Sequence, residues 1–155
     1  MAAFTHLNPW GSRFTAGDYG LYYAAAEIET AVAETRHHRA RFLAATAQGP
    51  IELDMLVYAA SLRAELHDIR PEWQTRPELY DPDDYSASQR LGRELRDAGS
   101  WGIWYRSVRR PAGECFAVLR PPALSNCRQE RHLAYVWDGK AIVSVYEKRA
   151  FDVDG

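Results

Sequence analysis

Apolar residues recur at helical spacing in the segment that follows the first cluster of tyrosines. From Glu27 to about Thr46, apolar and small residues repeat every three to four positions, which predicts a long helix. The predicted core-facing row is Ile28, Val32, Thr35, Arg39 and Phe42. Glu34 belongs to a second row with Glu27, Ala31 and His38, so we expect its carboxylate to point away from the apolar row.

A second helical pattern is predicted between residues 84 and 99. It has N-cap candidates at its start, two leucines on one face and a glycine that ends it: Asp84 or Ser86, Leu91, Leu95 and Gly99. Residues 70–83, which precede it, contain three prolines and many charges. They have no regular period, and we predict an irregular surface segment there.

Other segments have the composition or alternation of strands. Tyr19–Ala24 is aromatic, and Gly102–Tyr105 and Cys115–Leu119 are short apolar runs that suit buried strands. Leu56–Leu66 alternates with period two over eleven residues, although its SLRAEL portion also fits a helix. The length of the alternation favours a strand.

The C-terminal run RHLAYVWDGKAIVSVYEK is predicted to form a hairpin. Two apolar-rich segments flank Asp138-Gly139, a dipeptide that favours a type I′ turn. Because strands outnumber helices and few strands are joined by a helix, the pattern predicts an α+β fold. The length of 155 residues fits one domain over residues 1–155.

The composition narrows the class of protein. The apolar share is 46%, which is ordinary for a globular chain. The longest apolar stretches have about five residues, against the roughly 20 of a membrane-spanning helix. The N-terminus has no signal-peptide pattern. Cys115 and Cys127 form neither a metal-binding cluster nor a disulfide framework, so we expect a cytoplasmic protein without a metal.

The charge balance argues against a general nucleic-acid binder. The net charge is −2, whereas such proteins carry a basic face. The 17 arginines against two lysines reflect either a GC-rich genome or guanidinium groups that grip phosphate, and composition does not choose between these readings. Aromatic and basic residues gather in one stretch and could stack on bases: Trp101, Trp104, Tyr105, Arg106, Arg109 and Arg110. The weak net charge favours a packing role for them.

Three polar residues stand where predicted elements begin or end. Arg13 lies in the loop of residues 8–17, Glu34 lies in the first helix, and Ser107 follows the strand Gly102–Tyr105. Loops and strand ends supply many active-site groups. Each residue alone also has an ordinary structural explanation.

Two multi-residue motifs resemble the signatures of the RES-domain family. The first is GSRFTAGDYGLYYAAAEIETAVAE and the second is DPDDYSASQRLGRELRDAGSWGIWYRSVR. The family is named after an arginine, a glutamate and a serine, which here correspond to Arg13, Glu34 and Ser107. The similarity extends from about Asn8 to Tyr146. Only twelve residues precede Arg13, so the segment that family members usually carry before this motif is expected to be short or missing.

The resemblance implies a fold and a reaction. RES domains are similar to ADP-ribosyltransferases, with a split β-sheet core and flanking helices that clamp NAD⁺. NAD⁺ would be the substrate, and its nicotinamide–ribose bond would break through an oxocarbenium-like state. The ADP-ribose would pass to phosphate, to water or to a target protein, and the sequence does not fix which.

The resemblance also assigns roles. Glu34 would stabilise positive charge on the ribose, and Arg13 would grip the pyrophosphate. Tyr22 matches the family's active-site tyrosine and would pack against nicotinamide or ribose, with Tyr23 on the opposite face of the strand. Ser107 would hydrogen-bond the nicotinamide amide or position the acceptor, and no neighbouring base makes it a nucleophile.

Further positions match the second motif or adjoin Glu34. Arg109 is expected to contact NAD⁺, whereas Gln89 is expected to support packing or a loop. His37 and His38 suggest a metal, but no acid or cysteine has the matching spacing, so we interpret both as solvated helix residues.

Family resemblance also implies a partner. RES toxins are companions of an antitoxin with an Xre-type helix-turn-helix domain that covers the active-site entrance, so DNA binding would belong to the antitoxin. A target protein of ADP-ribosylation is a further expected partner, whereas a membrane or direct nucleic-acid contact is not. Two alternatives stay open: a RES-like module that binds without catalysis, and a toxin that cleaves RNA.

Overall fold

The computed structural model describes residues 11–153, which form two β-sheets and two α-helices. The four-stranded sheet has the order β1-β5-β4-β3, and the three-stranded sheet has the order β2-β6-β7. The strands are β1 (Tyr22–Ala25), β2 (Ile51–Leu62), β3 (His67–Asp68), β4 (Gly102–Arg106), β5 (Glu114–Val118), β6 (Leu124–Trp137) and β7 (Ile142–Lys148). The α+β class and the split β core are therefore confirmed.

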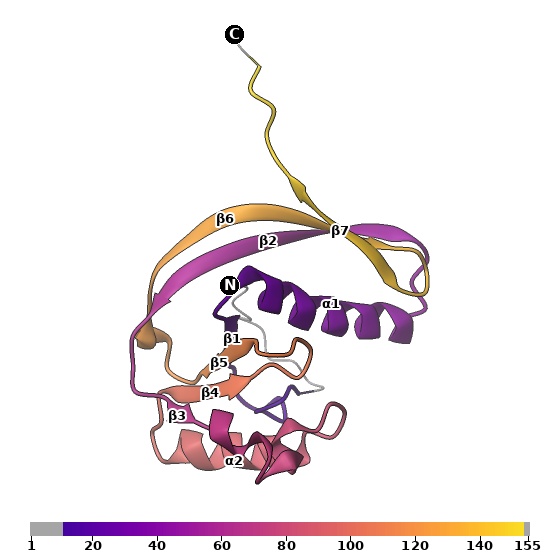
Figure 1. The fold of residues 1–155 in the computed structure, drawn as a ribbon. Helices are drawn as coiled ribbons and strands as arrows, with labels where there is room; N and C mark the ends of the chain where they lie inside the picture. Colours follow the sequence, from indigo (N-terminus) through magenta and orange to yellow (C-terminus); the bar gives the residue numbers. More distant parts are fainter. Residues whose placement is uncertain (1–10, 154–155) are drawn as a thin grey trace.

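Helix α1 (Ile28–Ala45) lies between the two sheets. The long strands β2 and β6 arch over it, and the small sheet and helix α2 (Ser86–Asp97) lie on its other side (Figure 1). Bulges between Val57 and Tyr58 and between Ala59 and Ser61 interrupt the pairing of β2 with β6, and bulges bend strands. The strand predicted over Leu56–Leu66 is confirmed, although it begins earlier and ends at Leu62.

One face of α1 packs on the arched sheet. Leu43 is buried against a cluster from β6 and β7, which consists of Leu133, Tyr135, Trp137 and Ile142. Val32 packs on the same cluster, and Thr35 shares a hydrogen bond of 2.7 Å with the hydroxyl of Tyr135. The prediction that Phe42 belongs to this row is wrong, because Phe42 is 58% exposed. Successive helical residues are about 100° apart, so of the neighbours Phe42 and Leu43 only Leu43 faces the sheet.

The hairpin of β6 and β7 is confirmed, but its turn differs from the prediction. The carboxylate of Asp138 accepts the backbone N–H groups of Lys140 and Ala141 at 2.7 and 2.8 Å. Gly139 has a φ of +101°, and Lys140 is not among the residues with positive φ. A type I′ turn needs positive φ at both central residues, so the type I′ prediction is wrong.

The segment predicted as an irregular surface excursion is partly core. It forms two short 3₁₀ helices, η1 (Arg70–Trp73) and η2 (Pro77–Tyr80), and Leu79 is fully buried. A third, η3 (Pro121–Ala123), precedes β6. Regular periodicity is absent from such short turns, so the sequence pattern gave no sign of this burial.

Helix α2 confirms the second helical prediction and brings the N-terminal loop to the core. The N-cap residue is Tyr85, without a side-chain cap, so the prediction of Asp84 or Ser86 at this position is wrong. The carboxylate of Asp84 accepts the N–H of Ser86, the first residue of the helix, and Gly99, with a φ of +77°, follows its end as predicted. A Cβ on Gly92 would lie 2.1 Å from the carbonyl oxygen of Phe14. The absence of a side chain at Gly92 therefore lets the loop of Phe14 approach the helix.

Candidate active site

A pocket of about 80 Å³ lies between α1 and the small sheet. Its walls come from the N-terminal loop, β1, the Glu34 row of α1, the residue before α2, β4 and β5. The lining residues are Ser12, Arg13, Tyr23, Ala24, Ala25, Ala31, Glu34, Thr35, His38, Tyr85, Tyr105 and Cys115. Arg13 and Glu34, 21 positions apart in the sequence, thus line the same pocket.

The carboxylate of Glu34 is held by two donors from the small sheet. The hydroxyl of Ser107 donates to Oε1 at 2.6 Å, and the thiol of Cys115 approaches the same oxygen at 4.0 Å. The side chain of Glu34 is 23% exposed, so it keeps limited access to solvent. The second oxygen, Oε2, is left for other contacts in the pocket.

Ser107 is positioned by the turn between β4 and β5. Its Oγ accepts the backbone N–H groups of Arg109 and Arg110, each at 3.1 Å, while its own proton goes to Glu34. Ser107 is not among the lining residues of the pocket. The geometry makes it a support for Glu34, and its role toward the nicotinamide amide or the acceptor stays a prediction.

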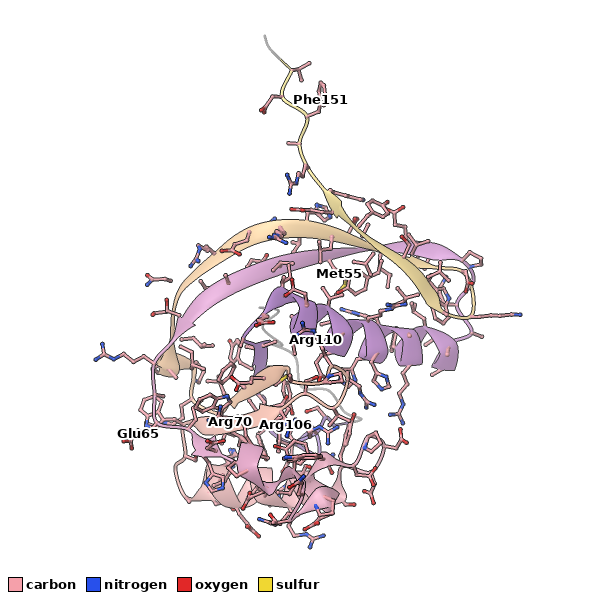
Figure 2. The ribbon with its side chains drawn as sticks, in the orientation of Figure 1. Met55, Glu65, Arg70, Arg106, Arg110 and Phe151 are labelled. Atoms are coloured by element: carbon pink, nitrogen blue, oxygen red, sulfur yellow. The ribbon has the colours of Figure 1, made fainter. Side chains whose placement is uncertain are left out.

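Two contacts bring this turn against α1. The guanidinium of Arg110, labelled beneath α1 in Figure 2, donates to Glu27 Oε2 and to Thr30 Oγ1, both at 3.1 Å. A Cβ on Gly113 would lie 2.7 Å from Thr30 Oγ1, so only glycine permits this approach. The turn therefore reaches α1 one helical turn before Glu34.

Arg13 is buried, with 8% of its surface exposed. Its Nη1 donates to the carbonyl oxygens of Leu79 and Asp81 at 3.3 and 3.0 Å, and its guanidinium lies 4.6 Å from the centre of the Tyr85 ring. Nε and Nη2 have no hydrogen-bond partner among residues 11–153. Within the described part of the chain, Nε and Nη2 are therefore not engaged by another protein group.

The loop that carries Arg13 is fixed by Gln89 of α2. The amide nitrogen of Gln89 donates to the carbonyl oxygens of Ser12 and Thr15 at 2.9 and 3.2 Å. This confirms the expectation that Gln89 supports a loop. Residues 8–10 of the predicted loop lie outside the described residues.

Tyr23, rather than Tyr22, is the tyrosine of β1 that lines the pocket. Its hydroxyl accepts the N–H of Phe14 at 3.0 Å and shares a hydrogen bond of 2.6 Å with Ser12. Burial raises the pKa of Tyr23 to about 12. Successive residues of a strand face opposite sides, and of the two tyrosines only Tyr23 is among the lining residues.

Arg109 is held beside the pocket without lining it. Its Nη2 donates to the carbonyl oxygen of Pro82 at 2.6 Å and lies 3.4 Å from the hydroxyl of Tyr85. Arg109 thus contacts Tyr85, which lines the pocket. Tyr85 belongs to the second motif, but it was not predicted from the sequence as a site residue. Direct contact of Arg109 with NAD⁺ stays a prediction.

His38 and Cys115 were not predicted as pocket residues. Nε2 of His38 lies 3.8 Å from Oε2 of Glu34, and the side chain is 49% exposed, so His38 is in contact with solvent as expected but also lines the pocket. The expectation of a solvated histidine is wrong for His37, because its Nε2 is buried. Desolvation lowers the pKa of His38 and outweighs the opposing effect of Glu34. Burial, reinforced by the charge of Glu34, raises the pKa of the Cys115 thiol to about 12.

A larger groove of about 520 Å³ adjoins the pocket. It lies between the arched strands and the start of α1, and it shares Ala24, Ala25 and Ala31 with the pocket. No group of His, Cys, Asp and Glu side chains that could hold a metal occurs within residues 11–153. Nor is any helix in the described part of the chain long and apolar enough to cross a membrane.

The aromatic and basic stretch around Trp104 forms stacked pairs instead of an open basic face. Trp104 stacks on Phe116 at 5.9 Å, and the guanidinium of Arg70 lies 3.2 Å from the Trp104 ring centre. Arg70, labelled in Figure 2, is paired with Asp68 and Glu114 at 2.9 and 2.8 Å. Its charge is therefore compensated within the fold.

Comparison with known proteins gives two results. A model of the RES domain matches residues 1–138. An uncharacterized protein of Sinorhizobium fredii, y4oC, is 34% identical over 157 residues, an alignment that covers 100% of this chain and 63% of the relative. The chain thus spans less than two thirds of that relative's length.

Proposed function

This chain belongs to the RES-domain family, and on that premise we propose that it is a toxin that breaks the nicotinamide–ribose bond of NAD⁺. The ADP-ribosyl group then passes to an acceptor. The observation that carries the proposal is the shared pocket of Arg13 and Glu34, in which Ser107 fixes the carboxylate.

Glu34 suits the charge that develops in this reaction. Nicotinamide leaves as a neutral ring, so the site needs no strong acid, and the positive charge gathers on the ribose. A carboxylate that is already oriented stabilises this charge without reorganising during the reaction. The hydrogen bond from Ser107 to Oε1 supplies that orientation and leaves Oε2 toward the ribose.

Arg13 suits the anionic part of the substrate. Nε and Nη2, which have no partner among residues 11–153, can form a charge-assisted pair with a phosphate oxygen, while the Nη1 contacts hold the group in place. Tyr23 and Tyr85 supply aromatic surface in the same pocket for nicotinamide or ribose. We assign to Tyr23 the role that the resemblance gave to Tyr22.

The volumes of the pocket and the adjoining groove agree with an NAD⁺ molecule that the pocket encloses only in part. Pockets that bury a whole drug-sized ligand measure roughly 300–1,000 Å³. The pocket of about 80 Å³ would enclose one end of NAD⁺, and the adjoining groove of about 520 Å³ has room for more of it.

The family also suggests a partner for the toxin. We propose an antitoxin with an Xre-type helix-turn-helix domain that covers the pocket, and a cytoplasmic complex in which DNA contacts belong to the antitoxin. The RNA-cleaving alternative is not favoured, because Arg70, which lies over Trp104 of the aromatic stretch, is paired with Asp68 and Glu114. Within the stretch, Arg110 is paired with Glu27.

A nicotinamide-release assay tests the reaction class. Purified protein is incubated with NAD⁺ alone, with inorganic phosphate and with cell extract, and free nicotinamide is measured by chromatography. We expect release in at least one condition. Absence of release in all three would refute the enzyme and favour a binding module.

A further inference from the structure

His38 lies at the border between the pocket and solvent. It lines the pocket, yet half of its side chain is exposed, so it borders both Glu34 and solvent. Its Nε2 and the Oε2 of Glu34 are 3.8 Å apart. This separation is too long for a direct hydrogen bond but allows one oxygen atom to contact both groups.

We propose that His38, together with Oε2 of Glu34, receives the proton of a hydroxyl acceptor, which is water or the alcohol of a protein side chain. This inference rests on the proposed function and names the acceptor class for it. It excludes inorganic phosphate as the preferred acceptor.

The proton balance distinguishes the two acceptor classes. In the reaction the bond between C1′ of the ribose and the nicotinamide nitrogen breaks, and its electron pair neutralises the nicotinamide ring. The acceptor oxygen forms the new bond to C1′. A hydroxyl must then lose a proton, which passes to Nε2 of His38 and on to solvent, whereas the phosphate dianion attacks without losing one.

The charges around the pocket favour a neutral hydroxyl acceptor over the phosphate dianion. Arg13 is the single cation among the lining residues of the described chain, and two carbonyl oxygens already occupy part of its fork. A dianionic acceptor would face Glu34 with no further cation in the lining. Desolvation and the nearby His37, Arg109 and Arg13 lower the pKa of His38, so its imidazole is uncharged before the reaction. Glu34 acts in the opposite direction, and it is the group that favours the protonated imidazole once the proton has been received.

His37 provides a matched control on the same helix. It is the neighbouring imidazole, but it does not line the pocket, and its Nε2 is buried. Substitution of His37 changes a histidine of α1 without changing the proposed proton acceptor.

The test compares wild type, His38→Ala, His38→Gln and His37→Ala at pH 8. Each is given NAD⁺ in phosphate-free buffer, with methanol, with inorganic phosphate, and with cell extract and labelled NAD⁺. Mass spectrometry separates ADP-ribose, methyl ADP-riboside, the ADP-ribose phosphate ester and the modified amino acid. Thermal melting identifies any variant that has lost its fold. If one of the two His38 variants is unfolded, the other is used for the comparison.

The inference predicts ADP-ribose, methyl ADP-riboside or a modified hydroxyl residue as the main product of wild type. Loss of His38 is expected to lower kcat by roughly 100-fold or more with little change in the KM for NAD⁺. Added imidazole should restore part of the rate of His38→Ala, which a merely structural role would not allow, and His37→Ala should resemble wild type.

Other outcomes separate the two proposals. A phosphate ester as the main product, a modified lysine or arginine, or an unchanged rate in both His38 variants would overturn the inference while the NAD⁺-cleaving function stands. If the wild-type protein released no nicotinamide in any condition, both the NAD⁺-cleaving function and the role of His38 would be refuted.

Discussion

The hydroxyl of Ser107 donates a hydrogen bond of 2.6 Å to Oε1 of Glu34, 73 positions earlier in the chain. This contact joins the turn after β4 to the middle of α1, and so it couples the small sheet to the helix that lies under the arch. The backbone N–H groups of Arg109 and Arg110 fix the serine in turn. Glu34 is therefore oriented before any substrate arrives.

Removal of that hydrogen bond should reduce turnover more than binding. Ser107→Ala leaves Glu34 in the pocket but free to rotate, and it deprives two backbone donors of their acceptor. A hydrogen bond to a charged group contributes about 1.5–3 kcal/mol, so we expect kcat to fall roughly 10- to 100-fold. Steady-state kinetics measure this, with the exposed Ser144→Ala as control. A rise in KM at constant kcat would place Ser107 in substrate binding instead.

The local patterns of the sequence sufficed for the α+β class, the two helices and the C-terminal hairpin. They could not pair Glu34 with Ser107, because that contact depends on the close approach at Gly113. Neither could alternation within β1 decide which tyrosine faces the helix. The RES motifs identified Arg13, but its carbonyl partners come from an aperiodic segment in which nothing marks Leu79 as buried.

The two tyrosines of β1 allow a matched comparison. Tyr23→Phe removes the partner of Ser12 and of the Phe14 N–H, which should loosen the Arg13 loop and destabilise the fold by about 1–3 kcal/mol. We expect the KM for NAD⁺ to rise as well. Tyr22→Phe changes a side chain outside the pocket and should be nearly neutral. Denaturant unfolding and steady-state kinetics of both variants measure these effects, and the reverse ranking would restore Tyr22 to the site.

Arg13 should bind NAD⁺ through the several N–H donors of its planar guanidinium rather than through its positive charge alone. Arg13→Lys keeps the charge but cannot bond two carbonyl oxygens and a phosphate together. We expect the KM for NAD⁺ to rise at least about tenfold in this variant, as the loss of one charge-assisted contact implies. Arg93→Lys, on the exposed face of α2, is the control. If Arg13→Lys binds NAD⁺ as wild type does, the phosphate role is wrong.

Stability should fall at high pH. The pKa values of Tyr23 and Cys115 are each raised to about 12 in the folded state, from ordinary values of 10.0 and 9.0. The unfolded chain therefore releases these protons first, and the stability that they contribute is present below pH 9 and is lost as pH rises toward 12. Urea unfolding between pH 7 and 10.5 should show this decline, and Cys115→Ala should make it shallower. A free energy of unfolding that is constant over this range would contradict the burial of both groups.

The central claim is that the carboxylate of Glu34 drives the cleavage of NAD⁺, and turnover of Glu34→Gln tests it most directly. Glutamine keeps an oxygen for the Ser107 hydrogen bond but removes the negative charge, and Glu29→Gln changes an exposed carboxylate of the same helix. With both variants folded, nicotinamide release by Glu34→Gln should be lower by roughly 10²–10³-fold or more, while Glu29→Gln retains the wild-type rate. Release by Glu34→Gln at the wild-type rate would contradict the claim.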